Sequence, residues 1–210
     1  GAWWVQDAAA SLPVQLFGDN LKEKCIADIC AAPGGKTAQL ILAGAEVIAV
    51  DRSEKRLKIL TENLKRLSFS PEIVCEDAVI WQPNTLVDGV LIDAPCSATG
   101  TIRRHPDIKY LKNNKVILQT QQVQLRLLEA ATKMIKPDGQ IVFSTCSLQP
   151  EEGPKVIDSF LSEHSNWQRK SIPPKLKQNH NEFITSAGDI RTFPFHLSNY
   201  DSQEHTQNHK

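Results

Sequence analysis

Short β-branched segments alternate with helix-like segments through most of this chain, and this alternation is the strongest constraint on its fold. The β-branched segments are short, apolar runs typical of strands buried on both faces, at 26–29, 46–50, 72–75, 87–92 and 140–144. Strands separated by helices favour a parallel sheet, because parallel neighbours need a long crossover connection. The sequence therefore predicts an α/β fold, a mostly parallel sheet with helices on both faces.

Four helices are expected around these strands. One covers 36–43 after a glycine turn, and a second follows Ser53, a residue type that caps helix N-termini. A third covers 114–135 and ends at the turn-forming segment 136–139, and a fourth follows Pro154. The apolar positions recur at helical spacing, which predicts buried faces formed by Leu57, Leu60, Leu64 and Leu67 in the second helix and by Val116, Val123, Leu127, Ala131 and Met134 in the third.

Polar or thiol-bearing residues follow all five expected strands directly. They are Cys30–Gly35, Asp51, Asp77, the pair Asp93 and Cys96, and Cys146. In an open parallel sheet the carboxyl ends of the strands share one edge, where ligands bind. These residues are therefore expected to line one cleft.

The segment DICAAPGGKT (28–37) allows three interpretations of the ligand at the first strand end. Gly35-Lys36-Thr37 matches the second half of a phosphate-binding loop, but Cys30 stands where the first glycine of that motif belongs. The dinucleotide fingerprint GxGxxG is absent. The third ligand is S-adenosylmethionine: Gly34 and Gly35 let the backbone pass close to it, Asp51 accepts hydrogen bonds from the ribose hydroxyls, and Asp77 takes the adenine amino group. Each acid taken alone is equally explained as a loop or capping residue.

Two cysteines lie in strand-end loops, Cys96 in Asp93-Ala94-Pro95-Cys96 and Cys146 in Thr145-Cys146-Ser147. A lone cysteine there is ordinarily inert packing, but two facing one cleft, one of them near an acid, indicate chemistry. A thiolate that adds to C6 of cytosine makes C5 nucleophilic enough to accept a methyl group, and Asp93 is suited to stabilise the adduct at N3. The spacing alone does not decide which thiol attacks.

Composition limits the function classes. The chain has 24 basic and 24 acidic residues, so only a local patch can bind nucleic acid; 103–115 holds five Lys or Arg against one Asp, a pattern that a solvated helix face explains equally well. The five cysteines form no CxxC pair, so no metal is expected. No apolar run approaches the roughly 18 residues of a membrane span, and no signal peptide is recognisable. We expect a cytoplasmic monomer without a membrane partner.

Five motifs resemble the Sun (Fmu)-type RNA 5-methylcytosine methyltransferases, most closely the branch that acts on small-subunit (16S) ribosomal RNA. They are WVQDAAA (4–10), DICAAPGGKTAQL (28–40), AVDRSEKRL (49–57), LIDAPCSATGTIRRHPDIKYL (91–111) and STCSLQPEEG (144–153), with an echo in GDIRTFP (188–194). The resemblance implies a Rossmann-like fold, S-adenosylmethionine as cofactor and 16S ribosomal RNA as partner.

The resemblance also implies roles for single residues. Asp51 would hold the ribose, Asp77 the adenine, and Asp93 both the cofactor's reactive edge and the target base. Cys146 would be the nucleophile and Cys96 would help to release the product, whereas in DNA cytosine methyltransferases the Pro-Cys thiol attacks. The methionine and ribose side of the cofactor would lie against Cys30, Ala31, Ala32, Pro33, Gly34, Gly35 and Lys36, and RNA phosphates against Arg103, Arg104 and His105.

The chain departs from the family pattern in two places. The usual final strand has no counterpart after GDIRTFP, so either it is missing or other residues take its role. The N-terminal helical RNA-binding domain of the family is not recognisable. We expect one catalytic domain over 1–195 and a polar, disordered tail over 196–210. Two alternatives stay open, a transfer-RNA cytosine-C5 methyltransferase and a catalytically weakened RNA-binding or ribosome-assembly module.

Overall fold

The computed structural model describes residues 1–193 and residue 196. It forms two compact units, Gly1–Gln168 and the segment from Arg169 onward. The boundary between them falls inside the region 1–195 that was expected to be one domain. The first unit contains the sheet and every strand-end residue of the predicted cleft.

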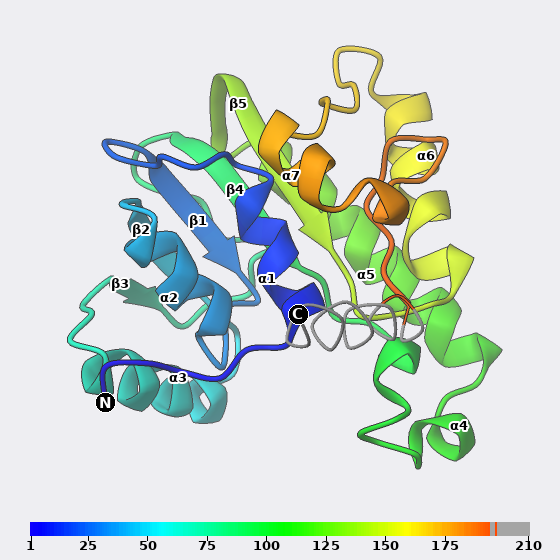
Figure 1. The fold of residues 1–210 in the computed structure, drawn as a ribbon, viewed down its shortest axis with the longest axis horizontal. Helices are drawn as coiled ribbons and strands as arrows, with labels where there is room; N and C mark the ends of the chain where they lie inside the picture. Colours follow the sequence, from blue (N-terminus) through cyan, green and yellow to red (C-terminus); the bar gives the residue numbers. More distant parts are fainter. Residues whose placement is uncertain (194–195, 197–210) are drawn as a thin grey trace, which may run out of the picture. The chain divides into compact units, whose positions relative to one another are not determined.

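The first unit is built on five strands in the order β3-β2-β1-β4-β5, and each neighbouring pair is parallel (Figure 1). The strands are β1 (Cys25–Ile29), β2 (Glu46–Val50), β3 (Glu72–Val74), β4 (Val87–Asp93) and β5 (Ile135–Ser144). This arrangement confirms the predicted α/β class. The register aligns the carboxyl ends, since Ile29 pairs with both Val50 and Ile92, and Asp93 pairs with Ser144.

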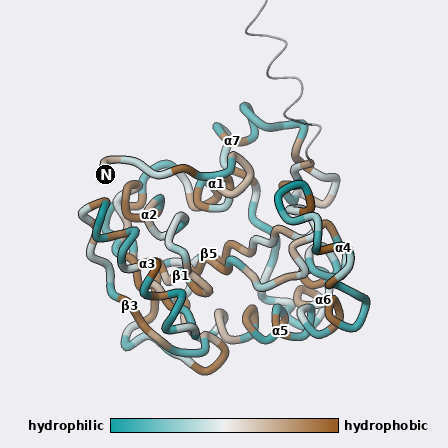
Figure 2. The backbone as a smooth tube through the Cα atoms, turned by 90° about the horizontal axis from the view of Figure 1, so that it is seen from below, coloured by the Kyte–Doolittle hydropathy of each residue, from teal (hydrophilic) through white to brown (hydrophobic). Residues whose placement is uncertain are grey.

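Helices cover both faces of the sheet because successive strand residues point to opposite sides. In β4, Leu91 packs in a cluster with α1 (Ala8–Gln15) and α2 (Gly35–Leu42), whereas Val90 and Ile92 pack with α5 (Asn114–Thr132) and α6 (Pro154–Glu163). The helix α3 (Glu54–Arg66) packs against α2 and β2 in a further cluster. In the view of Figure 2 the strands lie between α1 and α2 on one side and α5 on the other.

The helix α3 forms as predicted. The Ser53 hydroxyl caps it by accepting a hydrogen bond from the Arg56 amide, and Leu57, Leu60 and Leu64 are buried. Asn113 caps α5 in the same way, accepting from Val116 N. Of the predicted α5 face, Leu127, Ala131 and Met134 are buried, while the more N-terminal valines are only half-buried.

The end of α5 was predicted wrongly. The helix stops at Thr132, and the 136–139 segment lies inside β5 instead of forming the turn before it. Val87 pairs with Ile135 and Gly89 with Gln140, so β5 advances five residues while β4 advances two. Asp138 takes a positive φ of 63° there. Sheet pairing on both sides of this segment outweighs its turn propensity, and the extra residues form an irregularity within the strand.

The second unit contains the helix α7 (Pro174–Asn179), a short 3-10 helix at Asn181–Phe183, and an isolated antiparallel bridge between Ile184 and Ile190. Within it, the Arg169 guanidinium pairs with Asp189 at 3.0 Å. No strand follows β5 in the described ranges. The expected tail at 196–210 lies, apart from residue 196, outside the described residues.

Candidate functional site

The strand-end residues from four different strands are joined by direct contacts at the carboxyl edge of the sheet. The loop after β1 reaches the loop after β2 through Ala32 N, which donates to Asp51 Oδ2 at 3.2 Å. The start of α2 reaches β4 through Lys36 Nζ, 2.7 Å from Asp93 Oδ2. The loops after β4 and β5 meet where the sulfurs of Cys96 and Cys146 lie 3.4 Å apart. The structure thus brings these predicted residues together.

The turn between β1 and α2 contains two adjacent glycines, and their backbone conformation and surroundings differ. Gly34 caps α2 with a φ of 101°, and a Cβ on it would lie 3.1 Å from Leu60 Cγ. A Cβ on Gly35 would meet no atom within 4 Å. The backbone conformation therefore requires glycine at position 34, whereas position 35 borders open space of the kind a bound ligand can fill.

Asp51 is almost completely buried at the end of β2. Its carboxylate accepts hydrogen bonds from Ala32 N and, at 3.0 Å, from Ser53 N, and it pairs with Arg56 Nη1 at 3.0 Å. Oδ1 has one of these partners and retains room to accept another hydrogen bond. Nearby, burial and then the charge of Asp51 raise the pKa of the Cys30 thiol to about 12. The Cys30 thiol is therefore protonated near neutral pH, and it lines the loop without acting as a nucleophile.

A second buried acid, Asp28 in β1, lies beneath this loop. Thr37 Oγ1 donates to its Oδ2 at 2.6 Å, while its Oδ1 has no hydrogen-bond partner in the structure. Burial raises the pKa of Asp28 to about 7. Periodicity alone did not single out this residue, because an acid in the middle of an apolar strand has no distinctive spacing. Its neighbour in space, Asp93, is more open and also accepts a hydrogen bond from Ser144 Oγ at 3.1 Å.

Asp77 follows β3 at the same edge, where the Asp51 amide donates to the carbonyl of Val74. Its side chain is exposed and accepts a hydrogen bond from Val79 N at 3.0 Å. It thereby closes the turn that leads to Trp81, which packs into the core beside α5. Asp77 therefore has the loop-residue role that the sequence offered as one explanation for it.

A hydrogen bond joins the two thiols, and it shifts their pKa values in opposite directions. The S–H of Cys146 lowers the pKa of Cys96 to about 6, helped by hydrogen bonds from Thr145 and from the Ala98 backbone and opposed by burial. The same bond, together with burial and the negative charges at Cys96 and Asp93, raises the pKa of Cys146. Of the two thiols, Cys96 is therefore the more acidic.

Sequence reasoning missed the acid that lies behind this thiol pair. Glu152, in a 3-10 turn at Pro150–Glu152, is completely buried. Its carboxylate contacts Ser97, which follows Cys96, and Ser147, which follows Cys146. The residue lies in the motif STCSLQPEEG, but nothing in the local pattern distinguishes it from the adjacent Glu151.

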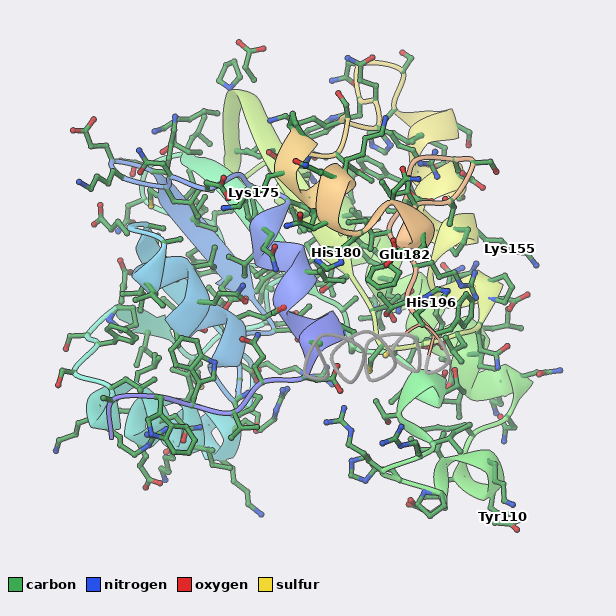
Figure 3. The ribbon with its side chains drawn as sticks, in the orientation of Figure 1. Tyr110, Lys155, Lys175, His180, Glu182 and His196 are labelled. Carbon is green, nitrogen blue, oxygen red and sulfur yellow. The ribbon has the colours of Figure 1, made fainter. Side chains whose placement is uncertain are left out.

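The expected RNA contacts Arg103, Arg104 and His105 are exposed on the segment between β4 and α5. Arg104 lies 3.9 Å from a carboxylate oxygen of Asp7. The segment is tied to the thiol loop, since Gly100 N donates to the carbonyl of Cys146 at 2.9 Å. Its short helix α4 (Ile108–Leu111) carries Tyr110, which points outward from the molecule (Figure 3).

Within residues 1–193 and 196, no group of three or more His, Cys, Asp or Glu side chains is arranged to hold a metal ion. Among the helices described there, none combines the length and apolar character needed to cross a membrane.

Comparison with known proteins places this site in a family. Two curated relatives are both named ribosomal RNA small subunit methyltransferase B. The protein of Vibrio vulnificus is 44% identical over 80% of this chain and 43% of its own length. The protein of Vibrio cholerae is 43% identical over 75% of this chain and 37% of its own length. The chain thus spans about two fifths of the curated relatives it matches.

Two solved structures from Pyrococcus horikoshii are similar as well. A methyltransferase homologue is 36% identical with a TM-score of 0.60, covering 76% of this chain and 51% of its own. NSun6, solved with SFG, is 30% identical with a TM-score of 0.68, covering 76% and 42%. The family model described as 16S rRNA methyltransferase RsmB/F matches residues 17–202, the greater part of the sequence. The chain therefore belongs to the 16S rRNA methyltransferase RsmB/F family.

Proposed function

We propose that this chain transfers a methyl group from S-adenosylmethionine to C5 of a cytosine in small-subunit ribosomal RNA, through a covalent bond between Cys146 and C6 of the base. The observation that carries the proposal is the pair of thiols 3.4 Å apart at the carboxyl edge of the sheet, where Asp93 accepts a hydrogen bond from Ser144, two residues before Cys146. Two thiols that share one proton supply both a nucleophile and a nearby acceptor for its proton.

The addition step uses both sulfurs. As the Cys146 sulfur bonds to C6, its proton passes to the Cys96 thiolate, which lies 3.4 Å away. The electrons of the C5–C6 double bond shift toward C4 and N3, which leaves an enamine whose C5 is the nucleophile that takes the methyl group. The Asp93 carboxyl, 2.7 Å from the Lys36 ammonium, is the group proposed to face N3, to give it a proton as negative charge develops there, and to take that proton back on elimination.

The elimination step reverses the proton movement. A base removes the C5 proton, the C5–C6 double bond re-forms and the bond between C6 and Cys146 breaks. The proton held by Cys96 returns to the departing Cys146 sulfur, so the pair again holds one proton and one negative charge. This assigns Cys96 to product release, the role that the family resemblance implies.

The residues of the β1–α2 loop fit S-adenosylmethionine, which supplies the methyl group when bound. The open space beside Gly35 leaves room for a ligand against the backbone, and Asp51 Oδ1 retains acceptor capacity for a ribose hydroxyl. Of the similar structures, NSun6 was solved with SFG, an analogue of this cofactor. We propose that 30–36 and Asp51 bind the cofactor, with Asp77 on its adenine side.

One observation favours the opposite assignment of the thiols. The pKa of Cys96 is lowered to about 6 and that of Cys146 is raised, so Cys96 is the resting thiolate. If the attacking group is the thiol that is ionised at rest, Cys96 forms the bond to C6, as the Pro-Cys thiol does in DNA cytosine methyltransferases.

A denaturing gel separates these assignments. The protein is incubated with small-subunit ribosomal RNA and S-adenosylmethionine, comparing Cys96→Ala with Cys146→Ala. We expect Cys96→Ala to accumulate a covalent protein–RNA adduct and Cys146→Ala to form none. Without Cys96, the hydrogen bond and negative charge that raise the pKa of Cys146 are gone, so Cys146 can lose its proton to solvent and attack, but no neighbouring thiol returns a proton for release. The reverse pattern would make Cys96 the nucleophile. Absence of adduct from both variants, with no methyl transfer by the wild type, would favour the RNA-binding module.

The RNA class needs its own arm of the experiment. The family and the relatives are named for small-subunit ribosomal RNA, and this chain spans only part of those relatives. Transfer RNA is therefore tested in parallel. Faster methyl transfer to transfer RNA than to ribosomal RNA would replace the proposed substrate with the alternative one.

A further inference from the structure

The buried carboxylate of Glu152 connects three elements behind the thiol pair. Its Oε1 accepts from Ser97 N at 2.7 Å and from the Thr120 hydroxyl on α5, and its Oε2 accepts from Ser147 Oγ at 2.6 Å and from the Ser97 hydroxyl. The side chain has no exposed surface. No lysine or arginine among the described residues forms an ion pair with it.

Two of the groups it binds are sequence neighbours of the thiols. Ser97 follows Cys96 and Ser147 follows Cys146, so one carboxylate holds both strand-end loops. The serine hydroxyls also lie 3.1 Å from each other, and Thr99 reinforces the junction by accepting from Leu148 N at 2.9 Å. Each loop is therefore fixed within one residue of its sulfur.

We propose that Glu152 is a positioning residue that holds the Cys96 and Cys146 loops together so that the two sulfurs share one proton. The inference rests on the proposed function, which uses that shared proton. The geometry favours a carboxylate at this position, because both oxygens face donors, including the Ser97 N–H, which cannot act as an acceptor. An alanine would leave these buried donors without partners and release both loops.

The chemistry predicts a difference between two substitutions. Glu152→Gln keeps an oxygen for Ser97 N if its amide group faces the two serine hydroxyls, which can rotate to accept. Glu152→Ala removes both acceptors. The sulfurs should therefore stay paired in the glutamine variant and separate in the alanine variant. Glu151→Ala is the matched control, since Glu151 lies in the same turn but binds Lys155, which points outward on α6 (Figure 3).

The test measures the thiols of the free protein, without RNA or cofactor. The alkylation rate of Cys96 by iodoacetamide is followed against pH by peptide mass spectrometry, and phenylarsine oxide, which bridges two adjacent thiols, reports whether the sulfurs are paired. In Glu152→Ala we expect the midpoint of alkylation to move up by at least one pH unit and bridging to fall at least tenfold. Glu152→Gln should lie near the wild type, and Glu151→Ala should match it.

Urea denaturation shows whether each variant is folded. If Glu152→Ala does not fold, Ser147→Ala replaces it, because that change removes the link from Glu152 to the Cys146 loop and leaves the bonds to Ser97 and Thr120. A folded Glu152→Ala variant, or a folded Ser147→Ala variant where it serves as the replacement, with a wild-type alkylation profile and wild-type bridging would overturn the proposal. Altered thiols in a protein that never methylates RNA would support the positioning role and count against the proposed function alone.

Discussion

At the scale of the residue, Asp28 shows how burial changes the chemistry of a side chain. The carboxyl has no exposed surface, and one of its oxygens has no hydrogen-bond partner. Burial is the main reason that its pKa is raised from 3.8 to about 7; the Thr37 hydroxyl opposes this shift, as does Lys36, while Asp93 and Asp51 add to it. The carboxyl is therefore largely protonated in the folded protein below neutral pH.

This shift predicts a pH dependence of stability. Because the folded pKa lies above the unfolded one, the stabilising contribution is full below about pH 4 and is lost as pH rises through about 7. Asp28→Asn, which is neutral at every pH, should gain stability relative to the wild type by roughly 4 kcal/mol between pH 4 and 8. Urea denaturation at steps across this range measures it. A constant difference between the two proteins at all pH values would contradict the assignment.

At the scale of the element, the junction between the glycine turn and α3 couples the cleft to the core. Leu60, in the middle of α3, is completely buried and lies against Gly34. Gly34 in turn caps α2, and Lys36 in the first turn of that helix forms an ion pair with Asp93. The helix packing and the shape of the turn therefore depend on each other.

Alanine at each of the two glycines tests this coupling. Gly34→Ala places a Cβ 3.1 Å from Leu60 Cγ at a φ of 101°, so we expect a loss of about 1–2 kcal/mol or more in the free energy of unfolding. Gly35→Ala is the matched control, because its Cβ meets no atom within 4 Å. It should keep wild-type stability and weaken S-adenosylmethionine binding if the cofactor fills that space. Equal stability of the two variants in urea denaturation would refute the packing argument.

At the scale of the whole molecule, the even balance of 24 basic and 24 acidic residues offers no general attraction for RNA. Binding then depends on where positive charge is concentrated. Arg103 and Arg104 stand exposed on the segment that Gly100 ties to the Cys146 loop. A phosphate held there would lie on a segment anchored at the thiol pair.

Removing this local charge should weaken RNA binding and its salt dependence. For the double variant Arg103→Ala/Arg104→Ala we expect the slope of log K against log salt to fall by about 1.4–1.8, the value for two lost phosphate contacts. Filter binding or fluorescence anisotropy at several salt concentrations measures the slope. Lys55→Ala/Lys58→Ala on α3 removes the same charge elsewhere and should change it less. Equal slopes for both double variants would show that the segment has no special role.

Features that depend on local pattern could be predicted from the amino-acid sequence. The β-branched runs and the leucine spacing of α3 predicted the strands and this helix, because side-chain periodicity reflects the geometry of each element. The convergence of Asp51, Asp93 and the two cysteines also followed, since parallel strands end at one edge. The five sequence motifs indicated the family.

Features that depend on long-range packing could not be predicted in this way and are seen only in the folded protein. Glu151 and Glu152 are adjacent and identical in type, yet only Glu152 is buried against both thiol loops. The hydrogen bond between Cys96 and Cys146 joins residues fifty positions apart in the sequence. The 136–139 segment lies within β5 because β4 pairs with the residues on both sides of it, Ile135 and Gln140. Burial, strand pairing and the meeting of distant loops are properties of the folded chain, so no local pattern could encode them.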